Sequence, residues 1–202
     1  MFPSAKLWTA LTFIVSVTAS SLDKRGSSVI IGYRTVSAAQ AQGYKNAGNT
    51  LAWSESRSSD QLGEGVYISP RIADWPGAST NWDCAILADS NAWNLVNKAW
   101  VPASDGCTPL WWKIGDPNRP AYLKALGGSS FTPSNTALLS RIDGFELLQL
   151  LIPPQLLGAK GGLKISVQCA AKTDTEGIAA ISIYGDVDWS SWLNVKGTVQ
   201  II

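Results

Sequence analysis

Two of the three cysteines lie in stretches with the residue pattern of β-strands, and this restricts the fold more than any other feature. Cys84 begins the apolar run 84–88, and Cys169 ends the alternating run 163–169. Because strands can hold α-carbons at the distance that a disulfide needs, we predict a bond between Cys84 and Cys169. Cys107 lies in a polar turn and is the odd cysteine, either free or bonded to another molecule.

Residues 1–20 have the features of a signal peptide. Lys6 supplies a positive charge, and the apolar run 7–17 is too short to span a bilayer and ends at a small-residue cleavage site. We therefore predict that the protein is secreted and extracellular, where an oxidising environment favours disulfides. Residues 21–25 are interpreted as a short pro-segment that ends in the dibasic pair Lys24-Arg25. Two solvated charges in a flexible leader would give the same sequence.

The remaining residues, 26–202, have the length of a single domain. The whole chain has 16 Lys and Arg residues against 15 Asp and Glu residues, a balance that does not indicate binding to nucleic acid or to a membrane surface. No apolar run after the leader has the length of a transmembrane helix. We expect a monomer that contacts neither nucleic acid nor membrane.

The chain contains no histidine, and this excludes several classes of site. A Ser-His-Asp hydrolase, a histidine-based nuclease and most catalytic zinc sites all need imidazole, the side chain that titrates near neutrality. We expect no metal cofactor. Any catalysis must use carboxylates, amides, hydroxyls, Arg or Lys.

Short runs rich in β-branched and apolar residues dominate the rest of the chain, so we predict the α+β class. One helix is expected after Ser37, which has the character of an N-cap, and a second over 121–126, between Pro120 and Gly127-Gly128. We therefore predict split β-sheets with one or two short helices in one domain. The strand candidates are 28–34, 65–68, 84–88, 95–101, 145–152 and 163–169, and 178–184 is expected to be the last ordered run before a turn with two tryptophans.

The stretch from Gln61 to Arg71 is the first candidate for a binding site. Its two glycines indicate a tight loop, and the strand that follows presents Tyr67 and Ser69 on one face. A glycine such as Gly65 lets a ligand or another backbone approach closely, so Tyr67 can form the wall of a pocket. An ordinary turn followed by a core strand would have the same pattern.

Three segments together resemble the ADP-ribosyltransferase toxin fold, the fold of heat-labile enterotoxin A. They are Tyr33-Arg34-Thr35 at the end of an early strand, Gly65-Val66-Tyr67-Ile68-Ser69, and Gln149-Leu150-Leu151-Ile152-Pro153-Pro154. The chain is also similar to fungal secreted proteins with enterotoxin-like domains. They share Gln-Leu-Gly-x-Gly, Trp-Asp-Cys and Leu-Gln-x-Leu-Ile-Pro-Pro with it, over nearly all of residues 26–202.

The resemblance implies that the substrate is NAD. Arg34 would pair with the diphosphate or the adjacent ribose, and the backbone of the Tyr33-Arg34-Thr35 segment would bind the nicotinamide amide. Gly65 would allow close approach of NAD, Tyr67 would lie against the nicotinamide ring, and Ser69 would orient the catalytic residue. A surface salt bridge, for example to Glu64, is the alternative for Arg34.

The chain departs from the family at the catalytic position, where Gln149 stands in place of a glutamate. A neutral amide can accept a hydrogen bond from the ribose 2′-hydroxyl, but it brings no charge to face the developing cation. By analogy with the loss of one stabilising donor, this removes about 3 to 4 kcal/mol of transition-state stabilisation. Parity directs Glu146 to the opposite face, and Asp143 would lie roughly 20 Å away in an extended chain.

These observations leave three hypotheses. The first is a secreted toxin or effector that binds NAD and acts on a host as an NAD glycohydrolase or mono-ADP-ribosyltransferase. The second is a catalytically degenerate effector that acts by binding a host protein. The third is a carbohydrate-binding module, suggested by Trp53, Trp75, Trp82, Trp111 and Trp112 in or near loops, although packing in the core accounts for most tryptophans.

Overall fold

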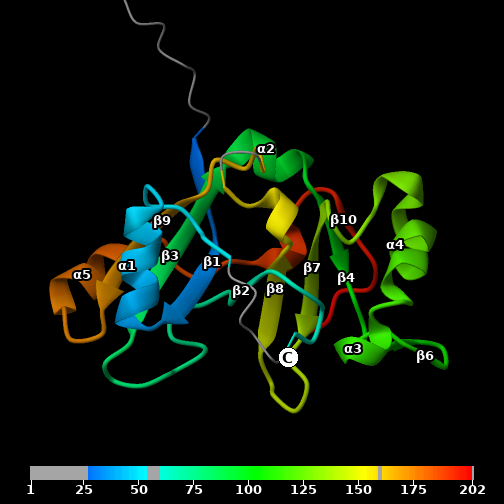
Figure 1. The fold of residues 1–202 in the computed structure, drawn as a ribbon, viewed down its shortest axis with the longest axis horizontal. Helices are drawn as coiled ribbons and strands as arrows, with labels where there is room; N and C mark the ends of the chain where they lie inside the picture. The colour runs from blue at the N-terminus through cyan, green and yellow to red at the C-terminus, as the bar shows by residue number, and fades with distance from the viewer. Residues whose placement is uncertain (1–26, 54–59, 159–160, 202) are drawn as a thin grey trace, which may run out of the picture.

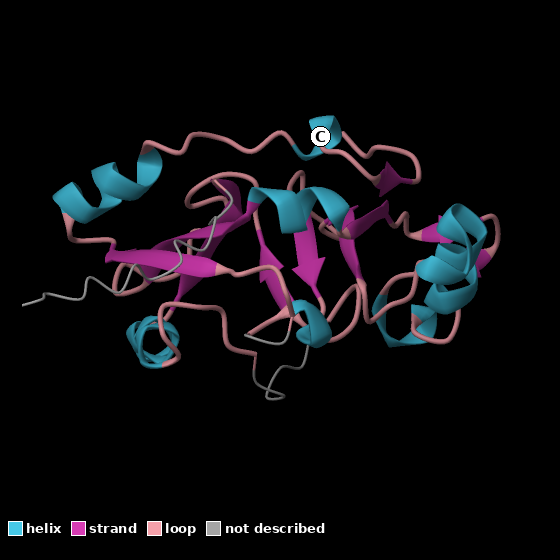
Figure 2. Ribbon diagram, turned by 90° about the horizontal axis from the view of Figure 1, so that it is seen from above, coloured by secondary structure: helices cyan, strands magenta, loops and turns pink. Residues whose placement is uncertain are grey.

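Two β-sheets form the framework of the molecule, and they meet along one edge (Figure 1). The computed structural model describes residues 27–53, 60–158 and 161–201. The predicted signal peptide, residues 1–20, and the predicted pro-segment, residues 21–25, lie outside the described residues. Seen from above, the strands form a middle layer, with α5 and the C-terminal segment on one side and α1 on the other (Figure 2).

The first sheet has three antiparallel strands in the order β1-β3-β9. They span Ser28–Val36, Trp82–Asp89 and Ser166–Ala171. Cys84 and Cys169 lie directly opposite each other in the register of β3 and β9, and they form a disulfide. The predicted pairing is therefore confirmed, and Cys107 is an exposed free cysteine.

The second sheet has five strands in the order β10-β4-β7-β8-β2. They span Val195–Lys196, Asn97–Trp100, Thr136–Arg141, Leu148–Ile152 and Val66–Ile68. The middle strand, β7, pairs in parallel with β4 and antiparallel with β8. Its first five residues are buried, although the sequence pattern predicts no strand there. A small hairpin of β5 (Ser104–Asp105) and β6 (Thr108–Pro109) lies outside both sheets.

Tyr33 in β1 and Ser69, the residue after β2, connect the two sheets. Each backbone N–H donates to the carbonyl of the other residue over 2.8 Å, which makes an isolated antiparallel bridge. The end of β1 that carries Arg34 therefore lies beside the end of β2 that carries Tyr67. Segments that are distant in the sequence meet at this junction.

The expectation of one or two helices is too low, because the described residues contain five short α-helices. The two expected helices are α1 (Ala38–Asn46), where the N-cap Ser37 accepts from the backbone N–H of Gln40, and α4 (Arg119–Gly127), which ends at Gly128 with φ of +75°. The others are α2 (Ser90–Leu95), α3 (Trp112–Gly115) and α5 (Thr175–Ser182), and the 3-10 helices are Gly128–Ser130, Pro154–Leu156 and Trp189–Ser191.

Two of the additional helices lie next to or within expected runs. Helix α2 includes only Leu95 of the strand expected over 95–101, which is present as β4, and Asp89 caps the helix by accepting from Ala92 N–H. Helix α5 is capped in the same way by Asp174, and it ends at Ser182 inside the run 178–184. Both have at most eight residues, too few for a clear helical period.

The core contains three fully buried tryptophans, Trp93, Trp100 and Trp189. Of the five tryptophans considered for sugar binding, Trp53, Trp82 and Trp111 pack against the core, whereas Trp75 and Trp112 are exposed. Lys98 in β4 is buried as well, and its Nζ donates to the carbonyl oxygens of Trp93, Val96 and Leu193. Burial lowers the pKa of Lys98 to about 8. Through its hydrogen bond to the carbonyl of Leu193, Lys98 connects the C-terminal segment to the five-stranded sheet.

Candidate functional site

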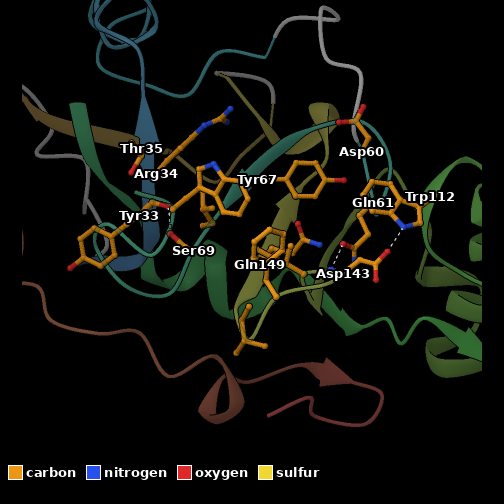
Figure 3. A pocket seen from close by; sticks show the side chains of 15 residues that line it. Tyr33, Arg34, Thr35, Asp60, Gln61, Tyr67, Ser69, Trp112, Asp143 and Gln149 are labelled. Carbon is orange, nitrogen blue, oxygen red and sulfur yellow. Dashed lines mark hydrogen bonds between the residues drawn. The ribbon is translucent and has the colours of Figure 1, made fainter. Parts of the chain in front are cut away.

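A cavity of about 470 Å³ lies at the junction of the two sheets (Figure 3). The strands β1, β2 and β8, the turn between β7 and β8, and the start of α3 contribute to its walls. Its lining residues are Tyr33, Arg34, Thr35, Asp60, Gln61, Tyr67, Ile68, Ser69, Trp75, Trp112, Ile142, Asp143, Phe145, Leu148 and Gln149. Every residue predicted for the site except Gly65 is in this set.

The wall formed by β1 carries Arg34, which is only 7% exposed. On either side of it, Tyr33 donates its hydroxyl to the carbonyl of Gly185 at 2.7 Å, and Thr35 donates to Asp83 Oδ1 at 2.6 Å. The ring of Tyr33 points away from Gln149 in Figure 3 and packs with Ala85. Arg34 is therefore the charged group that β1 contributes to the cavity.

Tyr67 stands in the middle of the cavity wall, in the position expected for it (Figure 3). Its hydroxyl donates to the carbonyl of Gly63 and accepts from the N–H of Leu62, each at 2.8 Å. Burial raises the pKa of this phenol well above its usual value, so Tyr67 is neutral at physiological pH. These two hydrogen bonds fix the ring that faces the cavity.

Gly65 does not line the cavity, which corrects its predicted role. Its φ is +149°, and a Cβ added there would clash with the carbonyl oxygen of Ile152 in β8. The glycine is required because the chain passes close to β8 just before β2 begins. It supports the strand that presents Tyr67.

Ser69 does not orient Gln149 either, which is a second correction. Its hydroxyl donates to the backbone carbonyls of Tyr33 and Arg71, each at 3.2 Å. The side chain that holds Gln149 is Ser140 in β7, whose Oγ accepts from Gln149 Nε2 at 3.1 Å. Both are buried, with Gln149 8% exposed and Ser140 fully enclosed.

Gln61 connects the loop before β2 to the strand pair β7 and β8. Its Nε2 donates to the carbonyl of Arg141 at 2.8 Å and to Ser140 Oγ at 3.3 Å, while its Oε1 accepts from the N–H of Asp143 at 2.9 Å. Gln61 is 3% exposed, so its amide is shielded from water, and its bond to Ser140 is buried while those to Arg141 and Asp143 are partly buried. Its amide therefore fixes the turn between the two strands.

The β7–β8 turn brings Asp143 to the same cavity as Gln149, which an extended chain would not allow. Strand β8 begins only at Leu148, and the turn closes through hydrogen bonds from Ile142 N–H to Leu147 O and from Phe145 N–H to Ile142 O. One continuous strand over 145–152, as expected from the sequence, would place Asp143 too far away. Glu146 does point elsewhere and pairs with Arg141 at 2.5 Å.

Trp112 fixes the carboxylate of Asp143. Its indole Nε1 donates to Asp143 Oδ2 at 2.9 Å (Figure 3). The backbone of Trp112 has φ of +59°, a conformation that bulky residues rarely adopt. It is held there by a hydrogen bond from its N–H to the carbonyl of Gln61 at 2.7 Å and by one from Arg119 to its own carbonyl at 3.3 Å.

A second cavity of about 740 Å³ adjoins the first, and the two share Asp60 and Trp112 as lining residues. Its most buried charged group is Arg119, which donates to the carbonyl of Leu110 and pairs with Asp116. Because the guanidinium is engaged in this way, it serves to position the segment around Trp112. The side chains that could bind a ligand or take part in a reaction lie mainly in the first cavity.

The mouth of the first cavity is aromatic. Trp75 and Phe145 meet edge to face with their ring centres 5.5 Å apart, and they are 48% and 52% exposed. The charges are separated: Figure 3 shows Arg34 on one side of Tyr67, and Asp60 and Asp143 on the other.

Among the described residues, no group of three or more His, Cys, Asp or Glu side chains could hold a metal ion. None of the helices in the described ranges has the length and apolar character that crossing a bilayer requires.

Comparison with known proteins gives one family match, which covers most of the site. No curated protein matches the chain. The profile of one protein family does match, over residues 60–198. This region contains Tyr67, Asp143 and Gln149, whereas Arg34 and β1 precede it. The chain belongs to the family DUF5910, which is described as a family of unknown function.

Proposed function

We propose that the protein is a secreted enzyme that binds NAD in the cavity at the sheet junction and hydrolyses it to ADP-ribose and nicotinamide. One observation carries this proposal: a single cavity has a buried guanidinium at one side, carboxylates at the other, and a tyrosine ring and an amide between them. NAD has the complementary pattern, because its diphosphate is anionic and its nicotinamide ring is cationic.

The binding contacts follow from these groups. Arg34 pairs with the diphosphate, for which a planar fork of donors is well suited. The ring of Tyr67 lies against the nicotinamide, where its π-face attracts the positive charge of the pyridinium. A volume of about 470 Å³ lies in the usual range of small-molecule sites. The exposed pair Trp75 and Phe145 contacts the part of NAD that remains at the mouth.

Gln149 orients the ribose rather than supplying charge. Its Nε2 donates to Ser140, so its Oε1 is the atom that accepts a hydrogen bond from the ribose 2′-hydroxyl. Cleavage of the bond between nicotinamide and ribose develops positive charge on the sugar, and a fixed acceptor at that position helps to align it. Hydrolysis is favoured over transfer to arginine because Leu147 and Gln149 occupy the two positions that are acidic in the arginine-modifying members of the family that the sequence resembles.

The test is to incubate the secreted protein with NAD and to measure free nicotinamide, with NAD binding followed by calorimetry. Arg34→Ala should weaken binding by about tenfold or more, and Gln149→Ala should slow release of nicotinamide. Arg71→Ala is the matched control, because Arg71 pairs with Asp74 outside the cavity. Absence of both binding and nicotinamide release in the unaltered protein would overturn the proposal.

A second candidate is an effector that acts by contact with a host protein, with the cavity inactive. It is favoured by Gln149 in place of an acid and by the exposed aromatic rings of Trp75 and Phe145. Under this alternative, a host response to the protein persists unchanged in Arg34→Ala. Under NAD hydrolysis, the response disappears together with nicotinamide release.

A further inference from the structure

We propose that Asp143 is a catalytic residue, and that its carboxylate supplies the negative charge that Gln149 cannot. This inference rests on the proposed NAD hydrolysis. Asp143 and Gln149 line the same cavity, and they are linked through the side chains of Gln61 and Ser140. The site therefore has an acid, although it comes from the turn before the catalytic strand and not from the strand itself.

The carboxylate of Asp143 is held in one orientation, as a reacting group must be. Its Oδ2 accepts from Trp112 Nε1, so Oδ1 is the atom that can act on a ligand. The donor is itself fixed, since Trp112 is bonded through its N–H to Gln61 and through its carbonyl to Arg119. Gln61 also accepts from the backbone N–H of Asp143, so it fixes the backbone of both Asp143 and Trp112.

The other acids near the cavity are less suited to this role. Glu146 pairs with Arg141 and does not line the cavity. Asp83 accepts the hydroxyl of Thr35, and it is not among the lining residues. Asp60 does line the cavity, but it is shared with the adjoining cavity, whereas Asp143 lies on the side of Gln149.

The reaction consumes one water molecule. The bond between the ribose carbon and the nicotinamide nitrogen breaks, and its electron pair remains on the nitrogen, which makes the released nicotinamide neutral. Water forms the new bond to the same carbon. Its proton passes to Asp143 and then to solvent, so that NAD and water give ADP-ribose, nicotinamide and a proton. Before that transfer, the carboxylate faces the positive charge that develops on the ribose.

The experiment compares Asp143→Asn, Asp60→Asn and Glu146→Gln in the full secreted protein, with NAD binding and nicotinamide release measured for each. The change from Asp143 to asparagine keeps the size of the side chain and the backbone N–H that bonds to Gln61. Asp143→Asn should lower kcat by about 100-fold or more, the range for a general base, and change the dissociation constant of NAD by no more than about threefold. Glu146→Gln should leave both unchanged.

Rescue separates a catalytic carboxylate from a structural one. Added formate supplies a free carboxylate and should restore part of the nicotinamide release of Asp143→Asn, while a structural defect would not respond. Trp112→Phe, which removes the indole donor, should lower kcat with little effect on the binding of NAD. Full activity of Asp143→Asn, or loss of activity in Asp60→Asn instead, would overturn the role of Asp143 and leave NAD hydrolysis standing. If the unaltered protein neither binds nor cleaves NAD, both proposals fail.

Discussion

The two walls of the cavity are built in different ways. The wall with Arg34 is the strand β1, which pairs with β3 along its length: Arg34 lies opposite Cys84 in β3, and Cys84 lies opposite Cys169 in β9. The wall with Asp143 is a turn that closes through two backbone hydrogen bonds, and the side chains of Gln61 and Trp112 hold it against the rest of the cavity. Strand pairing and a disulfide fix the first wall, whereas the second also depends on these two side chains.

This difference in construction suits the two walls to different roles in the proposed reaction. A position in a sheet is rigid over several residues, so the first wall suits binding of the diphosphate. A turn held by a few side-chain hydrogen bonds can be adjusted by single residues, and small changes there affect the alignment of the reacting groups. Damage to the first wall should therefore appear in stability and affinity, and damage to the second in turnover.

The largest expected effect comes from breaking the disulfide behind Arg34. The bond closes a loop with a sequence separation of 85. Loop-closure entropy alone assigns such a bond about 4 to 5 kcal/mol of stability. The double variant Cys84→Ala, Cys169→Ala should lose most of this amount in denaturant unfolding, and its affinity for NAD should fall. Cys107→Ser, at an exposed free cysteine, should change neither. A double variant as stable as the unaltered protein would show that strand pairing alone fixes this wall.

The first wall is also the part that the sequence reveals. The run 28–34, the N-cap Ser37 and the pairing of Cys84 with Cys169 depend on local pattern and on one chemical rule, and each is confirmed. The expected groups Arg34, Tyr67, Ser69 and Gln149 do line one cavity. The expectation that they share one site comes from the resemblance of the three segments, which gives the wrong partner for Ser69.

The second wall cannot be derived from the sequence. Strand β7 (Thr136–Arg141) has Thr and Ser among its buried residues, so it shows neither alternation nor a long apolar run, and Ser140 escapes prediction with it. The distance of Asp143 from Gln149 depends on a turn that Gln61, far away in the sequence, helps to hold in place. Nothing in the local pattern distinguishes Trp112 from the other aromatic residues in loops.

A smaller effect is expected from loosening the second wall. Gln61→Ala removes the acceptor for Asp143 N–H and the donors to Ser140 and Arg141. Loss of a typical intramolecular hydrogen bond costs about 0.5 to 1.5 kcal/mol in the free energy of unfolding, and the donor left unpaired at Asp143 is only partly buried. We expect kcat for nicotinamide release to fall more than the affinity for NAD, measured side by side. Gln42→Ala is the control, because the Gln42 side chain bonds to Asn46 on the exposed face of α1. An equal loss of affinity would contradict the division between the walls.

The smallest expected effect concerns Lys98, which lies on neither wall of the cavity. It tests whether the free energy of unfolding can change without a change in the affinity for NAD. The pKa of Lys98 is about 8 in the folded protein against 10.5 as the ordinary value, so between these values the unfolded chain binds more protons. Stability should therefore rise with pH, by about 1 kcal/mol between about pH 7.5 and 9, measured by denaturant unfolding. Burial raises the pKa of tyrosines such as Tyr67, so their ionisation in the unfolded chain lowers stability at higher pH. The pH range of the measurement ends below the range in which this opposite effect begins. Lys98→Met should flatten this rise. NAD affinity should not follow it, because Lys98 contacts α2 and the C-terminal segment rather than the cavity.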